Sequence, residues 1–204
     1  MCQISKSDNI ARDISSPFTY ICKMYSYQIS EFKEEDLKDV FFDSLREDYV
    51  SFDVCFRKKI AQQEKAYIYR DQDGIQAFLY IKNNEKEAVG DLTDAPRMKI
   101  GTIKICDSSK GNRLGEGALG IALWEWQKSD LDQIYLTVFR KHDSLIKLLK
   151  DFGFREGGTK ENELVLYKDK NNMTYDSSKA SFPYLDPSFS RGGYIPIDAE
   201  YHDS

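Results

Sequence analysis

The residues whose spacing points most directly to chemistry form a short glycine-rich turn, Asn112-Arg-Leu-Gly-Glu-Gly117, between a predicted strand and a predicted helix. Glycine lets backbone amides approach an anion closely, and the first turn of a helix adds a favourable potential. The turn therefore predicts a phosphate cradle. Glycine at the start of a packed helix also serves close packing alone, so the pattern by itself leaves both interpretations open.

A second candidate for chemistry is His142, which lies at the start of a later predicted helix. An imidazole titrates near neutral pH and can transfer a proton, although a solvated histidine that caps a helix is the more ordinary interpretation. Tyr135, in the preceding predicted strand, carries a hydroxyl that is a further candidate proton donor.

Metal chemistry finds no support in the sequence. The only histidines are His142 and His202, and neither has a second His or Cys at ligand spacing. We therefore expect no metal, and we expect free thiols in an intracellular protein. None of the four cysteines has metal-ligand spacing: Cys2, Cys22, Cys55 and Cys106.

The elements that must position these residues begin with a strand over residues 25–32, where apolar and polar side chains alternate. Helical spacing from Glu34 to Leu45 predicts a helix, and a second helix follows from Ser51, a plausible N-cap. Runs at 65–71 and 75–82, joined through Asp73-Gly74, predict a hairpin, and a loop over 83–97 leads to a strand over 98–106.

The glycine-rich turn then opens a helix that starts around Ala118 and ends near Asp130. A β-branched and aromatic run, 134–139, predicts a central strand. An amphipathic helix over 145–152 ends at Gly153, and two strands, 154–157 and 163–168, complete the domain. We thus expect a loosely ordered lead-in, a domain and an irregular tail, over residues 1–24, 25–169 and 170–204.

Composition restricts the class of protein. A chain of 204 residues with 41% hydrophobic residues can build one core with an extension. No run approaches the roughly 20 apolar residues of a membrane span, so we expect no membrane association and a cytoplasmic location. The net charge of -5 argues against a broad surface for nucleic acid.

The element order and two motifs resemble the GCN5-related N-acetyltransferases over about residues 25–168. The pyrophosphate loop of that family has Gln or Arg, two residues, Gly, one residue, then Gly or Ala. Asn112 stands at the Gln or Arg position, and Gly115 and Gly117 hold the small-residue positions. The run Leu148-Leu-Lys-Asp-Phe-Gly153-Phe154 looks like the final helix of the family and its Gly-Phe ending. The resemblance implies an α/β fold with a mixed, mostly antiparallel sheet flanked by helices.

The resemblance also implies a V-shaped split in the sheet, with acetyl-CoA between the strand that ends at Cys106 and the strand 134–139. The pantetheine arm would pair with backbone near Ile103, Ile105 and Cys106. An amine of a small molecule or peptide would attack the thioester carbonyl directly, without a covalent enzyme intermediate. The diphosphate would lie on these residues of the turn and helix start: Asn112, Arg113, Leu114, Gly115, Glu116, Gly117 and Ala118.

The chain departs from the family at several positions. Leu149 stands where the family often has a Tyr that protonates the leaving thiolate, and His142 stands where it often has Asn. Glu116 would repel phosphate unless it faces elsewhere, for example toward Arg113. The strand before the turn lacks the frequent Glu base and carries these polar residues instead: Lys99, Thr102 and Lys104.

Three functions therefore stay open. The first is an N-acetyltransferase that acts on a primary amine, either as a monomer or as a homodimer. The second is a CoA-binding or regulatory module with reduced catalysis, which Leu149 favours. The third is a toxin-type acetyltransferase acting on aminoacyl-tRNA, which the acidic composition disfavours.

Overall fold

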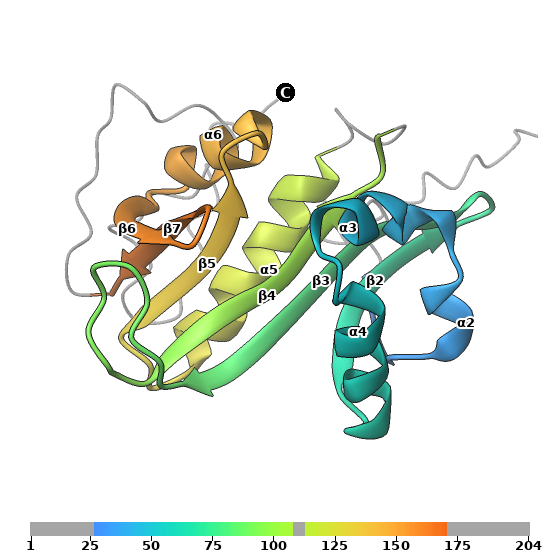
Figure 1. Cartoon of the computed structure of the whole chain (residues 1–204), viewed down its shortest axis with the longest axis horizontal. Helices are drawn as coiled ribbons and strands as arrows, with labels where there is room; N and C mark the ends of the chain where they lie inside the picture. Colours follow the sequence, from blue (N-terminus) through green and yellow to red (C-terminus); the bar gives the residue numbers. More distant parts are fainter. Residues whose placement is uncertain (1–26, 108–112, 171–204) are drawn as a thin grey trace, which may run out of the picture.

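Alternating side chains along the strands build a seven-stranded sheet in the computed structural model, which describes residues 27–107 and 113–170. The strand order is β1-β2-β3-β4-β5-β7-β6, and neighbours are antiparallel except β4 and β5 (Figure 1). This confirms the predicted mixed, mostly antiparallel sheet. The strands are β1 (Gln28–Glu31), β2 (Lys65–Asp71), β3 (Gly74–Glu85), β4 (Arg97–Ile105), β5 (Gln133–Phe139), β6 (Arg155–Lys160) and β7 (Glu163–Asp169).

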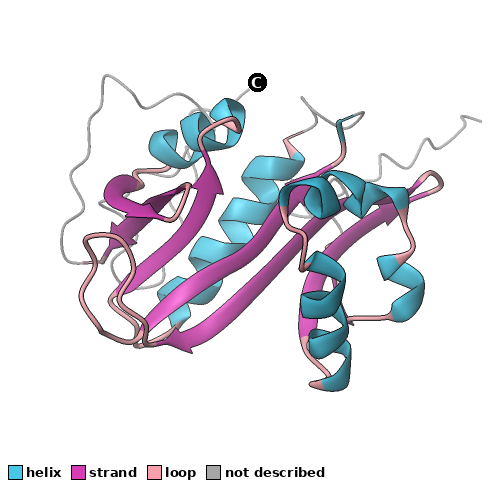
Figure 2. Cartoon of the chain, in the orientation of Figure 1, coloured by secondary structure: helices cyan, strands magenta, loops and turns pink. Residues whose placement is uncertain are grey.

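Helices cover both faces of this sheet, as Figure 2 shows. The main core lies between one face and the helices α5 and α6, and the opposite face carries the segment from Glu34 to Ala61, which we call the helical arm. The helices are α2 (Glu34–Leu37), the 3-10 helix η1 (Val40–Phe42), α3 (Asp43–Asp48), α4 (Phe52–Ala61), α5 (Leu114–Lys128) and α6 (Asp143–Asp151).

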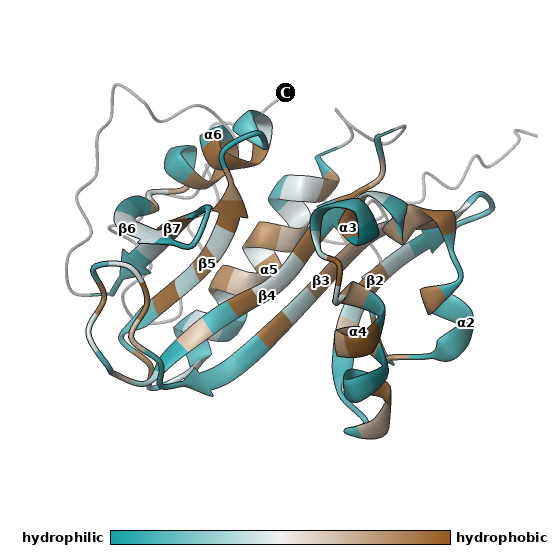
Figure 3. Cartoon of the chain, viewed as in Figure 1, coloured by the Kyte–Doolittle hydropathy of each residue, from teal (hydrophilic) through white to brown (hydrophobic). Residues whose placement is uncertain are grey.

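The alternation of β3 decides which side chains enter which core. Leu79 packs in the main core with α5, whereas its neighbours Phe78 and Tyr80 pack under the helical arm. Figure 3 shows the same alternation of hydrophobic and hydrophilic residues along β4. Because successive side chains of a strand point to opposite faces, both cores share one sheet.

The helical arm differs from the sequence prediction of one helix over residues 34–45. The chain leaves helical geometry at Asp39, which has an extended backbone and whose side chain accepts a hydrogen bond from the Phe41 amide at 2.9 Å. This local cap competes with a continuous helix and starts η1 instead. As a result Val40 is exposed, while Leu37 and Phe41 are buried as expected.

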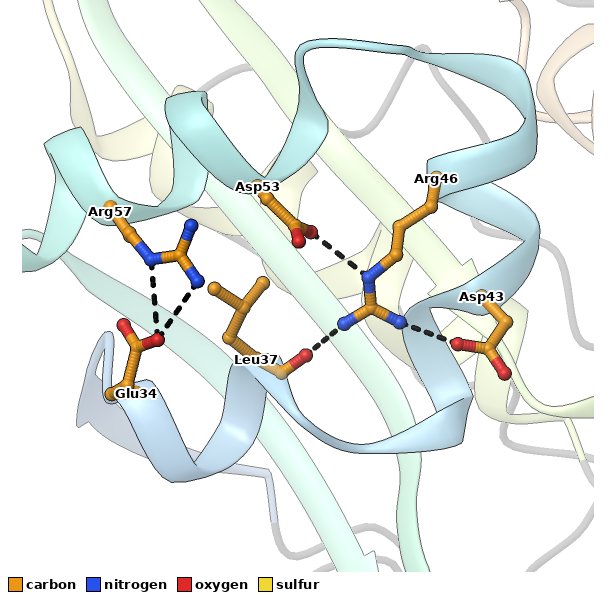
Figure 4. Close-up of polar contacts among 6 residues, drawn as sticks. All are labelled: Glu34, Leu37, Asp43, Arg46, Asp53 and Arg57. Carbon is orange, nitrogen blue, oxygen red and sulfur yellow. Dashed lines mark hydrogen bonds and ion pairs between the residues drawn. The ribbon is translucent and has the colours of Figure 1, made fainter.

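Arg46 holds the pieces of the helical arm together (Figure 4). Its guanidinium donates to Asp53 at 2.9 Å, to Asp43 at 2.5 Å and to the carbonyl oxygen of Leu37. One side chain from α3 thus contacts α4 and the end of α2. The fork of donors in arginine suits this role, because it can satisfy several acceptors in a fixed geometry.

The termini of two helices also differ in detail from the sequence prediction. The helix α5 begins at Leu114, so Gly115 and Gly117 lie in its first turn and not in the loop before it. Ser51 occupies the N-cap position of α4, but its side chain makes no capping hydrogen bond. Gly153 ends α6 in a left-handed conformation with φ 81°, as predicted. Cys55 is an exposed free thiol.

Within the described residues, no helix has both the length and the apolar character needed to cross a membrane. The same residues contain no group of three or more His, Cys, Asp or Glu side chains arranged to hold a metal ion. The predicted lead-in and tail, with Cys2, Cys22 and His202, lie outside the described residues.

Candidate active site

The sheet splits between its two parallel strands. In the described part of the chain, β4 and β5 pair at only two positions, Met98 with Ile134 and Lys99 with Tyr135. Beyond them β4 continues to Ile105 and β5 to Phe139, and Figure 1 shows the two strands diverging, with α5 visible behind them. The edge of β4 that faces β5 therefore presents backbone groups without a strand partner among these residues. This is the V-shaped split that the resemblance implies.

A β-bulge lies two residues beyond Lys99, the last residue of β4 that pairs with β5. Thr102 pairs with Tyr80 and Ile100 pairs with Ile81, so Gly101 is an extra residue in β4. A Cβ atom at Gly101 would lie 2.8 Å from the Tyr80 ring, which only glycine avoids. Bulges redirect backbone groups out of the ladder, so Gly101 exposes backbone at the base of the split. The bulge was not predicted from the sequence, although an isolated glycine within a strand pattern can indicate one.

The residues predicted to contact pantetheine follow the bulge, at the end of β4 and directly after it. Ile103 and Ile105 direct their side chains to the main core, and Cys106 packs against the core under the helical arm. The amide of Cys106 donates to the carbonyl oxygen of Gln76 at 2.8 Å, so it is committed to β3.

The start of α5 lies beside the end of this strand, because a Cβ atom at Gly115 would lie 3.8 Å from the Ile105 side chain. Arg113 adopts a left-handed conformation, with φ 57° and ψ 17°, and no side chain caps the helix. The first helical hydrogen bond runs from the amide of Gly117 to the carbonyl oxygen of Arg113 at 3.0 Å. The amides of Leu114, Gly115 and Glu116 precede that bond, so no intrahelical acceptor is available to them. Asn112 lies outside the described residues.

Side chains from neighbouring elements pack against the first turn of α5. The Tyr27 hydroxyl donates to the carbonyl oxygen of Leu114 at 2.7 Å. At Gly115 a Cβ atom would lie 3.2 Å from Leu148 on α6 and 3.8 Å from Ile105 on β4. The backbone of Gly115 thus approaches both neighbouring elements closely, while Ala118, one turn later, is fully buried.

The charges at this helix start are not neutralised by each other. Arg113 is exposed, and among the described residues no ion pair joins it to Glu116. The suggested contact between them is therefore not formed. One positive and one negative side chain stand near the amides of α5.

His142 is the N-cap residue of α6, but its side chain makes no capping hydrogen bond. Its Nε2 atom lies 3.0 Å from Oδ2 of Asp48, the last residue of α3. Lys141 pairs with the other oxygen of the same carboxylate. Although burial by itself raises it, the hydrogen bonds from Lys141 and His142 hold the pKa of Asp48 below its usual value.

Tyr135 occupies different surroundings. Its side chain is fully buried, and its hydroxyl lies 3.4 Å from Oε1 of Glu87. Burial, followed by the charge of Glu87, raises the pKa of Tyr135. The hydrogen bond from Lys160 lowers the pKa of Glu87, and the charge of Lys99 lowers it further. A phenol that ionises less readily and a carboxylate that binds protons weakly make a poor proton-transfer pair near neutral pH.

A second contact from the end of α3 reaches β5 and β7. The Tyr49 ring packs on Phe139 with centroids 5.2 Å apart, and its hydroxyl donates to the Glu163 carboxylate. Burial, together with Glu163, raises the pKa of Tyr49. On the β4 side, Lys104 donates to Ser44 of α3. The helix α3 therefore contacts both strands that border the split.

The structure thus brings the strand residues, the α5 amides and the split together, and it places His142 at the end of β5 against α3. It places Tyr135 against Glu87, Val89 and Leu92 instead. Leu149 is fully buried in the main core. Sequence reasoning missed Asp48, because its contact with His142 spans 94 positions and follows from the fold alone.

Many known structures share this fold, but their sequences are only distantly similar to this chain. No protein-family model and no curated protein sequence matches the chain. Ard1 from Thermoplasma volcanium aligns with a TM-score of 0.53 at 14% identity, over 71% of this chain and 98% of that one. NAA60 from Arabidopsis thaliana, solved with a bisubstrate analogue, gives 0.52 at 12% identity, over 70% and 97%.

An acetyltransferase of the GNAT family from Staphylococcus aureus gives a TM-score of 0.51 at 14% identity, over 70% of this chain and 98% of that one. GNAT denotes the GCN5-related N-acetyltransferases. The matched structures are covered almost completely, so the whole of their fold is present in this chain. The chain has the fold of the GCN5-related N-acetyltransferases.

Proposed function

We propose that the chain is an N-acetyltransferase that transfers the acetyl group of acetyl-CoA to a primary amine of a small molecule or peptide. The observation that carries this proposal is the geometry of β4. The strand leaves β5 after Lys99, and the uncapped amides at the start of α5 lie beside its far end at Ile105. An extended arm with amide groups and a diphosphate at one end matches such a strand edge followed by such a helix start.

The residues present fit this substrate. The free edge of β4 near Ile103 and Ile105 offers backbone groups to the pantetheine amides, and Cys106 marks its end. The amides of Leu114, Gly115 and Glu116 offer donors to the diphosphate, and Arg113 adds a positive charge. We extend the phosphate site to Asn112 on the resemblance alone, while Gly117 and Ala118 complete the helix turn behind it.

The acceptor side of the proposal rests on the same fold. NAA60, a protein with this fold, is known in complex with a bisubstrate analogue, which supports a site where two substrates meet. In this chain the acceptor would approach the bulge at Gly101 from the face that carries the helical arm. The segment of α3 borders that approach at both ends, because Ser44 accepts a hydrogen bond from Lys104 of β4 and Tyr49 donates one to Glu163 of β7.

In the reaction, the neutral amine attacks the thioester carbonyl, a C–N bond forms, and the C–S bond of the thioester breaks. One proton leaves the nitrogen and one proton ends on the CoA thiolate, so the products are an N-acetyl amide and free CoA. A thiol with a pKa of roughly 8.5 leaves readily, so the protein contributes mainly position and proton transfer. His142 is the proposed proton-transfer group.

The experiment is a transfer assay with the full chain. Acetyl-CoA is mixed with a panel of amines, amino acids and peptides, and both free thiol and acetylated product are measured. Equal amounts of thiol and product for at least one acceptor would support the proposal. Thiol release without product, or no release with any acceptor, would contradict transfer.

Leu149 favours a second candidate, a CoA-binding module with reduced catalysis. This position cannot donate a proton, and its side chain is completely buried in the main core. A calorimetric titration with acetyl-CoA, combined with the transfer assay, separates the two candidates, because the module binds acetyl-CoA but transfers no acetyl group to any acceptor.

A further inference from the structure

Asp48 is a charged residue in a buried position. Its side chain is only 5% exposed, although it ends a helix of six residues at the surface of the helical arm. A buried carboxylate is costly unless it is paired, and Asp48 is paired twice. Both partners, Lys141 and His142, come from the turn between β5 and α6, on the other side of the split.

The contact fixes which nitrogen of His142 carries a proton. A carboxylate can only accept a hydrogen bond, so Nε2 must donate across the 3.0 Å to Asp48. In the neutral ring Nδ1 is then the atom with the free lone pair. Nδ1 is not used as a helix cap, because the side chain of His142 makes no capping hydrogen bond. The hydrogen bond from Nε2 to Asp48 therefore fixes the orientation of the ring, and Nδ1 can accept a proton.

We propose that Asp48 is a positioning residue for acetyl transfer, which holds the His142 ring so that Nδ1 receives the proton of the attacking amine. This inference rests on the proposed function. The proton moves from nitrogen to Nδ1 as the C–N bond forms, and the imidazolium is stabilised by the adjacent carboxylate. The same proton then passes to the thiolate as the C–S bond breaks, so the ring returns to its neutral form.

Other charges surround this pair and provide controls. Lys141 binds the second oxygen of Asp48 from the same turn, and its side chain is 62% exposed. Asp143 follows His142 in the first turn of α6. Tyr49 follows Asp48 in the sequence, and its hydroxyl donates to Glu163. Of the two described residues that pair with Asp48, only His142 has a second nitrogen whose lone pair can accept a proton.

The test is a double-mutant cycle on turnover, using Asp48→Asn, His142→Ala and the double variant. Asn keeps the size of Asp48 and an oxygen acceptor but removes the charge that stabilises the imidazolium. We expect Asp48→Asn and His142→Ala each to lower kcat about ten-fold with the KM for acetyl-CoA within two-fold. In the His142→Ala background, Asp48→Asn should add less than two-fold, because both residues act through one ring.

The matched control is Lys141→Met, which removes the other partner of Asp48 and keeps the length of the side chain. It should leave kcat within two-fold. Three outcomes would each overturn the positioning role: additive losses in the cycle, an unchanged kcat in Asp48→Asn, or an equal loss in Lys141→Met. None of them would contradict acetyl transfer by the parent chain.

A second measurement does not need turnover. The chain has only two histidines, so a His202→Ala variant leaves one set of imidazole signals in a two-bond ¹H–¹⁵N spectrum. We expect the neutral ring to carry its proton on Nε2, and we expect Asp48→Asn to move the Nε2 signal. A ring protonated on Nδ1, or unchanged by the substitution, would overturn the geometry. Absence of transfer in the parent chain, by contrast, would refute the proposed function first.

Discussion

At Gly115 the backbone of α5 passes close to both β4 and α6, and the residue has no side chain to keep them apart. Leu148 and Ile105 lie within 3.8 Å of the point where a Cβ atom would stand. The amide of this residue is also one of those that precede the first helical hydrogen bond. Gly120 lies in the same helix, and a Cβ atom there would meet nothing within 4 Å.

These two glycines make a matched pair of variants. We expect Gly115→Val to weaken acetyl-CoA binding at least ten-fold, because the branched side chain occupies the space beside the diphosphate amides. Its free energy of unfolding should fall by only about 1 kcal/mol, since the atom it meets is the flexible tip of Leu148. Calorimetric titration and urea unfolding measure the two effects.

Gly120→Ala is the control in the same helix. It should leave acetyl-CoA affinity unchanged and raise the free energy of unfolding by about 0.5 to 1 kcal/mol, because alanine loses less backbone entropy than glycine. If Gly115→Val lowered binding and stability in equal measure, the glycine would serve packing and not the phosphate site.

At the scale of single residues, the sequence could indicate which types matter but not their surroundings. The glycines of the turn and His142 were identified because their chemistry follows from residue type. The burial of Tyr135 against Glu87 and the contact of Asp48 with His142 were not, because each joins residues from different elements. The pattern around Gly101 is that of an ordinary strand, because its bulge depends on the register with β3.

At the scale of elements, the helical arm is the part in which tertiary packing and local capping overrode the simple periodicity. The spacing of Leu37, Phe41 and Leu45 is helical, and it correctly indicates a shared apolar face. The break at Asp39 comes from a side chain that caps the next turn, a choice that periodicity does not report. The strands, in contrast, were predicted to within a few residues, since alternation depends on the two-sided sheet itself.

The contact of Asp48 with Lys141 and His142 should make the free energy of unfolding depend on pH. The pKa of Asp48 is lowered in the folded chain, so its carboxylate contributes stability above the usual pKa of an unfolded aspartate, about 3.9. That contribution disappears as the pH falls through the lowered pKa. We therefore expect Asp48→Asn to cost about 1.5 kcal/mol at pH 6 and less at pH 3.

Urea unfolding at several pH values measures this dependence. The difference between the parent chain and Asp48→Asn should shrink steadily from pH 5 toward pH 3. A difference that stays constant over this range would mean that the Asp48 charge does not stabilise the fold and that only its shape matters.

At the scale of the whole molecule, the order of elements was the most informative property of the sequence. A strand, two helical segments, three strands and then two helix–strand alternations fit few folds, and the sheet order confirms the one that was predicted. The split between β4 and β5 could not be derived from periodicity, because both strands have ordinary patterns. It arises from where parallel pairing stops, which is a property of the assembled sheet.

The last prediction concerns the choice of ligand by the whole molecule. The start of α5 offers amides but lacks the Lys-Ser or Lys-Thr of a nucleotide-binding P-loop and the spaced acidic residue of a dinucleotide site. The free edge of β4 is long enough to pair with a pantetheine arm, a group that ATP and NAD do not possess.

Acetyl-CoA at 100 times its Kd should therefore stabilise the fold by about 2.7 kcal/mol. For a chain of this size that corresponds to a rise in Tm of roughly 5 to 10 °C. ATP and NAD at the same concentration should shift the Tm by less than about 1 °C. Differential scanning calorimetry of the parent chain and of Gly115→Val measures both effects, and the variant should lose most of the rise with acetyl-CoA. A rise with ATP alone would show that the α5 amides bind phosphate without the β4 edge, and the assignment of acetyl-CoA to the split would then be wrong.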